Sequence, residues 1–463
     1  MDITYQYNES SAITKKKDQS ELFLAHYNED FQEKEVPCFF WGKLNQPYLI
    51  ARSLLTLSKV VAANFMPNSS ALRDPVITAG GQKLRLEAFS SCCSAYGKVD
   101  LLPEALDGEF LQQGTTNVDF NTEMIAALSK INTGENVFFS IGKKEFVMQK
   151  ADQKVVEKKV TLPLRWIKGM ATVQLLSAEM QEAAILDKLQ IQLLFRAIPK
   201  GDAKEDYYLS FRGKKPFLSP IKSKASICIG GIHRLRLAET MLPLTKKLVI
   251  YTSPTENATA FQFDLATDVS KAFSGVRFTL LLSRSFWRGF SGEGNALENL
   301  VEDIPKAWMQ KLNTYAQMNE EFTTEDPWLK TLSDYDFKNV ATRLSAMGLL
   351  GYDLAQQAYY YRKLPFKMSR VESLNPRYKN ALTIIKKGQY EWVDHSKERT
   401  ETRIRGSGVF HKVVITPDKA SCTCTWYASH GTSRGDCKHI LATKILKNHS
   451  EKELNQLLQE LEL

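Results

Sequence analysis

Four metal-binding side chains gather in two compact pairs near the C-terminal end of this sequence. Cys422 and Cys424 form the first pair, and Cys437 and His439 form the second after twelve intervening residues. The whole chain has only seven cysteines, so three of them in one short stretch are concentrated there. Zinc prefers four tetrahedral ligands, and a site filled by protein thiolates and imidazole is structural rather than catalytic. The spacing therefore predicts one structural Zn²⁺ ion.

The residues around these pairs predict a strand followed by a helix. Residues 409–415 form an extended, β-branched run, and the first cysteine pair lies just beyond it. Asp436 can cap a helix, in which Cys437, Leu441 and Ile445 recur on one face. The alternative is a reduced, buried set of cysteines without metal. Cysteine used as a small hydrophobic residue does not require paired donors at this spacing, so the metal site is favoured.

The pattern C-x-C-x12-C-x-H on a ββα layout resembles the SWIM-type zinc finger over residues 403–447. The resemblance implies Cys422, Cys424, Cys437 and His439 as the zinc ligands. SWIM modules are associated with DNA binding and with protein–protein contacts, and the family resemblance does not choose between them.

The order of segments ahead of the finger is also similar to a family of bacterial SWIM-containing proteins. The similarity rests on residues 286–294, FWRGFSGEG, and on residues 348–354, GLLGYDL. Genes of that family tend to lie beside those of a MoxR-type AAA+ ATPase and a von Willebrand A-domain protein. The resemblance therefore implies these two proteins as partners.

Composition and residue order predict an α+β multidomain chain with a mixed-sheet N-terminal body. With 43% hydrophobic residues in 463, the chain can bury large cores, and about 100–200 residues per domain gives two to four domains. Apolar alternation predicts strands at residues 189–195 and 248–251, and helical spacing predicts a helix at residues 47–64. The predicted divisions are a polar arm at 1–35, an α+β body at 36–320, a winged-helix-like segment at 325–368, a SWIM zinc finger module at 380–449 and an amphipathic helix at 450–463.

The sequence predicts a cytoplasmic protein without a membrane span. No apolar run of about 18 residues occurs, and the first residues carry neither a basic nor an apolar stretch of a secretory signal. The four cysteines outside the finger are scattered, and the total is odd, which does not indicate a disulfide framework.

Basic residues concentrate around the predicted finger. The net charge is +9, and residues 386–450 hold twelve Lys or Arg against six Asp or Glu. Concentrated basic residues beside a zinc finger favour contact with phosphates, so we expect nucleic acid, with DNA favoured. An ordinary solvated surface, or a dock for an acidic protein, are the alternatives. The candidate nucleic-acid-binding residues are Arg403, Arg405, Lys412, Arg434, Lys438 and Lys444.

A second region of the sequence is also a candidate for nucleic-acid binding. Residues 337–347 follow helical spacing, and residues 352–354 and 358–364 resemble two short strands, an order similar to the end of a winged-helix domain. In that interpretation the residues that contact phosphates or stack are Arg343, Arg362, Lys363, Lys367, Arg370, Tyr359, Tyr360 and Tyr361. The alternative is a small adaptor subdomain with a tyrosine-lined core, because winged helices also serve protein contacts.

The sequence contains no recognised catalytic motif. It lacks HExxH, GxxxxGK[ST], GxSxG and a GxGxxG before a helix. Arg288 beside Gly292-Glu293-Gly294 could bind an anion, and His233 could lie in a pocket, but a packed turn and a structural histidine are the simpler interpretations. We therefore expect a protein that is not an enzyme. An adaptor is the alternative function, and an enzyme of unrecognised fold in the first 320 residues is a third possibility.

Overall fold

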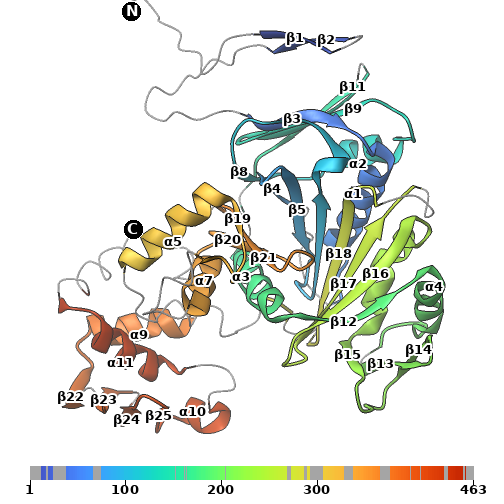
Figure 1. Ribbon diagram of the computed structural model, residues 1–463. Helices are drawn as coiled ribbons and strands as arrows, with labels where there is room; N and C mark the ends of the chain where they lie inside the picture. Colours follow the sequence, from blue (N-terminus) through green and yellow to red (C-terminus); the bar gives the residue numbers. More distant parts are fainter. Residues whose placement is uncertain are drawn as a thin grey trace, which may run out of the picture.

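Six antiparallel β-sheets and the helices packed on them make up the described part of the chain (Figure 1). The computed structural model describes residues 12–16, 19–23, 38–65, 75–151, 153–160, 162, 164–203, 205–267, 273–285, 289–291, 306–327, 337–364, 376–396, 398–406, 408–431, 436–451 and 454. In the predicted polar arm, strands β1 (Ala12–Lys16) and β2 (Gln19–Phe23) form a hairpin. The predicted C-terminal helix at 450–463 lies almost entirely outside the described residues.

The largest sheet has eight strands in the order β12-β16-β17-β18-β6-β5-β4-β8. Each neighbouring pair is antiparallel, which corrects the prediction of a mixed sheet. Short turns join consecutive strands such as β4 and β5, whereas a parallel pair needs a crossover of about a dozen residues. The strands are β4 (Val76–Gly80), β5 (Lys83–Phe89), β6 (Ala95–Leu101), β8 (Gly114–Asn117), β12 (Gln181–Leu186), β16 (Thr245–Thr252), β17 (Ala258–Leu265) and β18 (Val276–Ser283).

Two smaller sheets flank the large one in the body. A five-stranded sheet has the order β11-β10-β9-β3-β7, and a three-stranded sheet has the order β14-β13-β15. Their strands are β3 (Cys38–Leu44), β7 (Leu106–Phe110), β9 (Val137–Gly142), β10 (Glu145–Lys150), β11 (Gln153–Lys158), β13 (Asp206–Arg212), β14 (Lys215–Ser219) and β15 (Ile227–Gly230). The remaining body elements are α1 (Pro47–Ala62), η1 (Pro103–Ala105), α2 (Thr122–Ser129), α3 (Leu164–Glu179), α4 (Lys188–Ala197) and η2 (Ile232–Leu244).

Helix α1 covers the apolar face of the large sheet, in agreement with the helix predicted at residues 47–64. Its apolar side chains recur at helical spacing, and Leu54, Leu57 and Val60 are fully buried. Gly97 on β6 lies directly beneath them, because a Cβ there would stand 2.8 Å from a Leu57 methyl carbon. One continuous hydrophobic core therefore joins the helix to the strands of the body.

The strand predicted at residues 189–195 is instead helix α4. Alternation placed Leu189 and Ile191 on one face, but Leu189 is 64% exposed, whereas Ile191, Leu194 and Phe195 are buried at helical spacing. A capping box starts the helix, with the Asp187 carboxylate and the Gln190 amide each bonding the other's backbone N–H. The prediction at residues 248–251 is confirmed by strand β16.

Glu157 on β11 is a buried carboxyl group, and its ionisation lowers the stability of the folded state. Burial, with Asp119 and Glu123 nearby, raises the pKa of Glu157 to about 7, although the Asn121 N–H donates to it. The folded state therefore holds the proton more tightly than the unfolded state, and stability falls as the pH rises from about 4.5 to 7. We expect Glu157→Gln to have nearly wild-type stability at pH 5 but to exceed it at pH 8 by on the order of 1–3 kcal/mol. Thermal melting across this pH range measures the difference, and parallel curves for the two proteins would contradict it.

Candidate metal centre and nucleic-acid interface

The C-terminal zinc module is a four-stranded sheet with helices on one face. Its sheet order is β22-β23-β24-β25, and its hydrophobic cluster is separate from the core of the body. The module begins with α9, which packs closely on α11, so it starts slightly before the predicted residue 380. The elements are α9 (Pro376–Lys386), β22 (Tyr390–His395), β23 (Thr400–Arg405), β24 (Phe410–Ile415), β25 (Ala420–Cys422), α10 (Thr425–His430) and α11 (Lys438–Asn448).

Each predicted zinc ligand lies at the end of a regular element. Cys422 is the last residue of β25, and Cys424 is the N-cap of α10, where its sulfur accepts the Tyr427 N–H at 3.4 Å. Cys437 is the N-cap of α11 without a side-chain capping bond, and His439 follows in the first turn. The sequence placed the cap at Asp436, but that carboxylate pairs with Lys444 at 2.7 Å instead.

The four donor atoms lie close enough together to share one metal ion. All four lie within 4.8 Å of one another, and all four residues are buried. His439 Nδ1 is 3.7 Å from Cys422 Sγ and 4.0 Å from Cys437 Sγ. Zinc bonds of about 2.3 Å to sulfur and about 2.0–2.1 Å to nitrogen give a sulfur–nitrogen edge of roughly 3.6 Å, close to these distances. The cluster therefore fits one structural zinc ion, which Nδ1 of His439 and the three sulfurs would hold.

The protonation of the four ligands also indicates that the cluster binds a cation. A hydrogen bond from Cys422, followed by one from His439, lowers the pKa of Cys437 below its usual range. The same contact with Cys437, followed by burial, raises the pKa of Cys422 far above its usual range. The protein alone thus stabilises one thiolate and opposes a second, whereas zinc supplies the positive charge that three thiolates need.

Arg377 is a supporting residue that the sequence did not single out. Its guanidinium donates to the Asp436 carbonyl at 2.8 Å and lies 4.7 Å over the Trp426 ring. Asp436 precedes one ligand pair, and Trp426 follows the other. Arg377 on α9 therefore ties both halves of the metal centre to the rest of the module.

Three of the predicted nucleic-acid residues lie together on the solvent face of the zinc-module sheet. Arg403 and Arg405 alternate on β23, and Lys412 is the cross-strand neighbour of Arg403 on β24. Thr402, the residue before Arg403, faces the other way, where its hydroxyl lies 2.6 Å from that of Thr443 on α11. Successive strand residues point to opposite faces, so these three basic side chains lie on the side away from the helices.

The other candidates do not share this surface. Lys438 and Lys444 are on α11, which covers the opposite face of the sheet, and Lys444 is held by Asp436. Arg434 lies outside the described residues. The single basic surface predicted from the sequence is therefore divided between two faces of the module.

The zinc module also carries exposed apolar side chains, for which the sequence indicated no functional role. Val409 and Phe410 are 57% and 53% exposed at the β23–β24 hairpin, and Trp392 on β22 is 39% exposed. Phe410 is the cross-strand partner of Arg405. The alternation of side chains along β24 could have predicted that Phe410 is exposed, because it places Phe410 and Lys412 on one face and Val413 on the other.

The winged-helix-like segment is larger than predicted and has its own core. Helix α5 (Lys306–Asn319) and strand β19 (Glu321–Phe322) share a hydrophobic cluster with α7 (Phe337–Ala346), β20 (Leu350–Asp353) and β21 (Ala358–Tyr361). The sheet order is β19-β21-β20, so the unit begins at residue 306 rather than 325. We call residues 306–364 the hairpin unit.

The described side chains of the hairpin unit do not form the predicted base-stacking and phosphate-binding face. Tyr359 and Tyr361 lie inside its own cluster, as the tyrosine-lined adaptor alternative expected. Tyr360 points the other way and is 1% exposed, with the Arg85 guanidinium 4.0 Å from its ring centre. Arg362 is fully buried against the body. Lys363 is exposed, whereas the side chain of Arg343 and both Lys367 and Arg370 lie outside the described residues.

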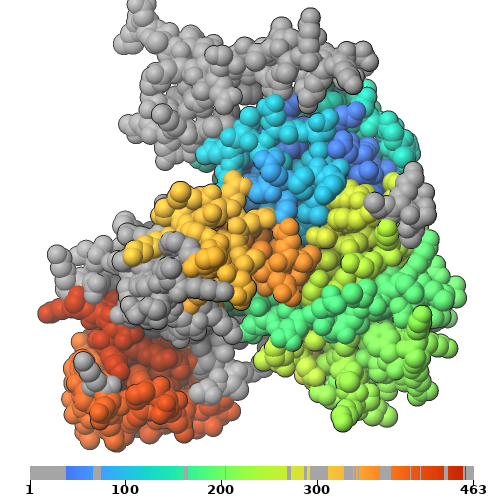
Figure 2. Space-filling view, in the orientation of Figure 1, coloured from blue at the N-terminus to red at the C-terminus, as the bar shows by residue number. Residues whose placement is uncertain are grey.

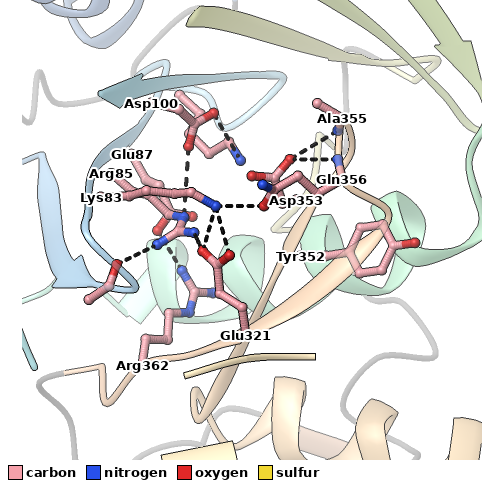
Figure 3. A network of polar contacts seen from close by, with 12 residues as sticks. Lys83, Arg85, Glu87, Asp100, Glu321, Tyr352, Asp353, Ala355, Gln356 and Arg362 are labelled. Carbon is pink, nitrogen blue, oxygen red and sulfur yellow. Dashed lines mark hydrogen bonds and ion pairs between the residues drawn. The ribbon is translucent and has the colours of Figure 1, made fainter. Parts of the chain in front are cut away.

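Buried ion pairs hold the hairpin unit against the charged face of the large sheet (Figure 3). Arg362 Nη1 lies 2.6 Å from Glu87 Oε2, and both side chains are fully buried. Lys83 Nζ lies 2.7 Å from Glu321, which also pairs with Arg85. Figure 2 shows the orange β20–β21 surface seated against the blue strands of the body. Apolar contacts accompany these ion pairs, because Leu354 and Leu364 of the hairpin unit belong to the hydrophobic core of the body.

Of the remaining candidates from the sequence, His233 has a structural position. His233 Nδ1 accepts the Ala203 N–H at 3.1 Å, and its ring packs edge-on against Phe65. Burial lowers the pKa of His233, which favours the neutral ring in this role. Arg288 and residues 292–294 lie outside the described residues.

Comparison with known families identifies the module around the metal centre. Residues 411–448 match the profile of the SWIM zinc finger, and this span contains all four ligands. The predicted resemblance to a SWIM finger is therefore confirmed for this part of the chain. No curated protein matches the sequence. None of the described helices is long and apolar enough to cross a membrane.

Several solved structures share a distant likeness with the chain. Proliferating Cellular Nuclear Antigen from Entamoeba histolytica is 10% identical, with 53% of this chain and 98% of that chain covered at a TM-score of 0.35. The PCNA2-PCNA3 complex from Sulfolobus tokodaii is 7% identical, with 52% and 98% covered at 0.36. A DNA polymerase sliding clamp from Pseudomonas aeruginosa is 11% identical, with 60% and 75% covered at 0.36. Likenesses at this level assign no function to the chain.

Proposed function

We propose that the chain is a non-catalytic, zinc-stabilised nucleic-acid-binding protein, with DNA as the favoured ligand. One observation carries the proposal: Arg403, Arg405 and Lys412 share the solvent face of a sheet whose opposite face holds the zinc ligands and helices. Neither Arg403 nor Arg405 makes an ion pair within the described part of the chain, so both guanidinium groups can meet phosphates. Zinc fixes the strands that carry them, because small modules of this kind lose their fold without metal.

The role of the hairpin unit in this proposal is to connect the module to the body. The three consecutive tyrosines at 359–361 and Arg362 are buried, so the proposed contact with nucleic acid uses the zinc module instead. The proposed partners are a MoxR-type AAA+ ATPase and a von Willebrand A-domain protein, and the resemblance at residues 286–294 and 348–354 supports them. The absence of any recognised catalytic motif supports a protein that acts through binding.

A protein-interaction adaptor is the second candidate function. Val409 and Phe410 are large apolar side chains exposed beside the basic residues, and such a combination also suits an acidic protein partner. If DNA and a protein partner bind the same face of the zinc module, each should displace the other. If they bind separate sites, both should bind at once.

The test is fluorescence anisotropy with duplex DNA, single-stranded DNA and RNA over a salt series. We expect Arg403→Ala/Arg405→Ala/Lys412→Ala to weaken binding and to reduce the log–log salt slope by about one unit for each phosphate that is no longer bound. The matched control is Lys438→Ala/Lys444→Ala on the helical face, which should retain most of the affinity. Zinc content and melting temperature must stay unchanged in both variants. No binding of any nucleic acid by the wild type at low salt would leave the adaptor as the function.

A further inference from the structure

The solvent face of the zinc-module sheet combines an exposed aromatic ring with basic side chains at one end. Phe410 is 53% exposed, and its cross-strand partner is Arg405. The next pair on the same face, two residues along each strand, is Arg403 with Lys412. We call these four residues the Phe410 face. Directly opposed residues in an antiparallel pair have Cβ atoms about 4.5–5.5 Å apart, so each cation stands beside its neighbour.

Charge on this sheet face changes from one end to the other. Lys412 lies 2.9 Å from Glu401, which also pairs with Arg399. Glu391 on β22 is the cross-strand neighbour of Arg403. The acidic residues thus lie toward β22 and the far end of β23, whereas Arg405 and Phe410 lie at the β23–β24 hairpin. The strongest attraction for a polyanion is therefore at the hairpin, where the aromatic ring is exposed.

The Phe410 ring suits unpaired bases better than a duplex. In a double helix both faces of each base are covered by its neighbours, so a flat ring on a sheet meets only base edges and phosphates. In a single strand a base can turn outward and stack on an aromatic side chain, while nearby basic residues hold the backbone. The step from the Arg405 pair to the Arg403 pair is about 7 Å along the strands, which is comparable with one nucleotide of an extended strand.

We propose that the zinc module binds single-stranded nucleic acid on the Phe410 face, with a base stacked on Phe410 and its flanking phosphates held by Arg405 and Arg403. This inference rests on the proposed nucleic-acid function and narrows its ligand class. Phe410 provides affinity for any base rather than sequence readout, because every base offers a stacking face.

The module contains a matched aromatic control for this proposal. Trp392 is also exposed, but its cross-strand partner is Thr402, which faces α11, so the ladder places Trp392 on the helical side of the sheet. Its ring stacks on His395 at 4.3 Å between ring centres. Removal of either aromatic ring takes away exposed apolar area in the same module, but only Phe410 lies beside the basic side chains of this face.

The experiment compares binding of a dT oligonucleotide, a single-stranded RNA and a mixed-sequence duplex to the full-length zinc-loaded protein. We expect the single strands to bind more tightly than the duplex. Phe410→Ala should weaken single-strand binding about 5- to 100-fold and leave duplex binding nearly unchanged. Phe410→Tyr should bind single strands about as tightly as the wild type, because a phenol ring stacks on a base as a phenyl ring does. Trp392→Ala should also bind single strands like the wild type.

Each outcome separates this inference from the broader function. If the duplex binds as tightly as the single strands and Phe410→Ala changes neither, the Phe410 face is not a stacking site, although nucleic-acid binding stands. If Trp392→Ala loses single-strand affinity and Phe410→Ala does not, the strand lies on the other face and the proposal is wrong. Binding to none of the three ligands overturns both the inference and the proposed function. Unchanged zinc content and melting temperature in the Phe410 variants exclude unfolding as the cause.

Discussion

Replacement of Cys437 with serine is expected to unfold the zinc module while the body stays folded. Cys437 is buried, occupies the N-cap position of α11 and lies within hydrogen-bonding reach of the three other ligands. Structural zinc contributes about 10–16 kcal/mol in small zinc modules, which exceeds the stability of most domains. The three cysteine ligands also belong to the hydrophobic cluster of the module, so loss of the metal disturbs that cluster.

The measurement combines zinc content, melting and limited proteolysis of the variant. We expect one zinc ion per wild-type chain and less than one in Cys437→Ser. The module beyond residue 376 should become sensitive to protease, and the transition of the body should persist. Cys38→Ser is the matched control, because Cys38 is a buried cysteine of the body that belongs to no metal cluster among the described residues. A Cys437→Ser protein that still holds a full zinc ion and resists protease would show that the cluster is not the metal site.

Breaking the Arg362–Glu87 pair is expected to destabilise the body by about 3–5 kcal/mol, because one partner is left buried and charged. Burial alone would raise the pKa of Glu87, but Arg362 and the Tyr96 hydroxyl lower it below its usual range, so the carboxylate is ionised at neutral pH. Glu87→Gln keeps the shape and removes the charge that neutralises Arg362. Urea unfolding, followed in the full-length protein, measures the loss.

A double-mutant cycle separates the ion pair from packing. Arg362→Met alone leaves the Glu87 carboxylate buried without its partner and should lower the free energy of unfolding by a similar amount. Glu87→Gln/Arg362→Met removes both charges and should recover much of that free energy. Arg277→Met offers a comparison, since Arg277 pairs with Asp264 at 3.0 Å in a more exposed setting on the same sheet. Additive losses in the cycle would mean that the two groups are not energetically coupled, and the hairpin unit would then be held by other contacts.

Local spacing was enough to predict the elements in which neighbouring residues decide the structure. The Cys422–His439 pattern specified the metal site, because four donors within a short stretch can meet only when the loop between them closes. Helix α1 and strand β16 followed from the period of their apolar residues. Helix α4 was missed although its capping box was present, because a short apolar run satisfies both a two-residue and a helical period.

Long-range contacts determined which polar residues are exposed. Arg362 and Glu87 are 275 positions apart, and nothing near either residue indicates that the other will bury it. The same limit divided the predicted basic surface, since the face of each residue depends on how β23, β24 and α11 pack together. The sequence by itself determined the zinc ligands and the periodic elements, because those depend on local geometry. Only the tertiary structure decided that Arg403, Arg405 and Phe410 face solvent while Tyr360 and Arg362 do not, because burial is set by whatever packs on a face from elsewhere in the chain.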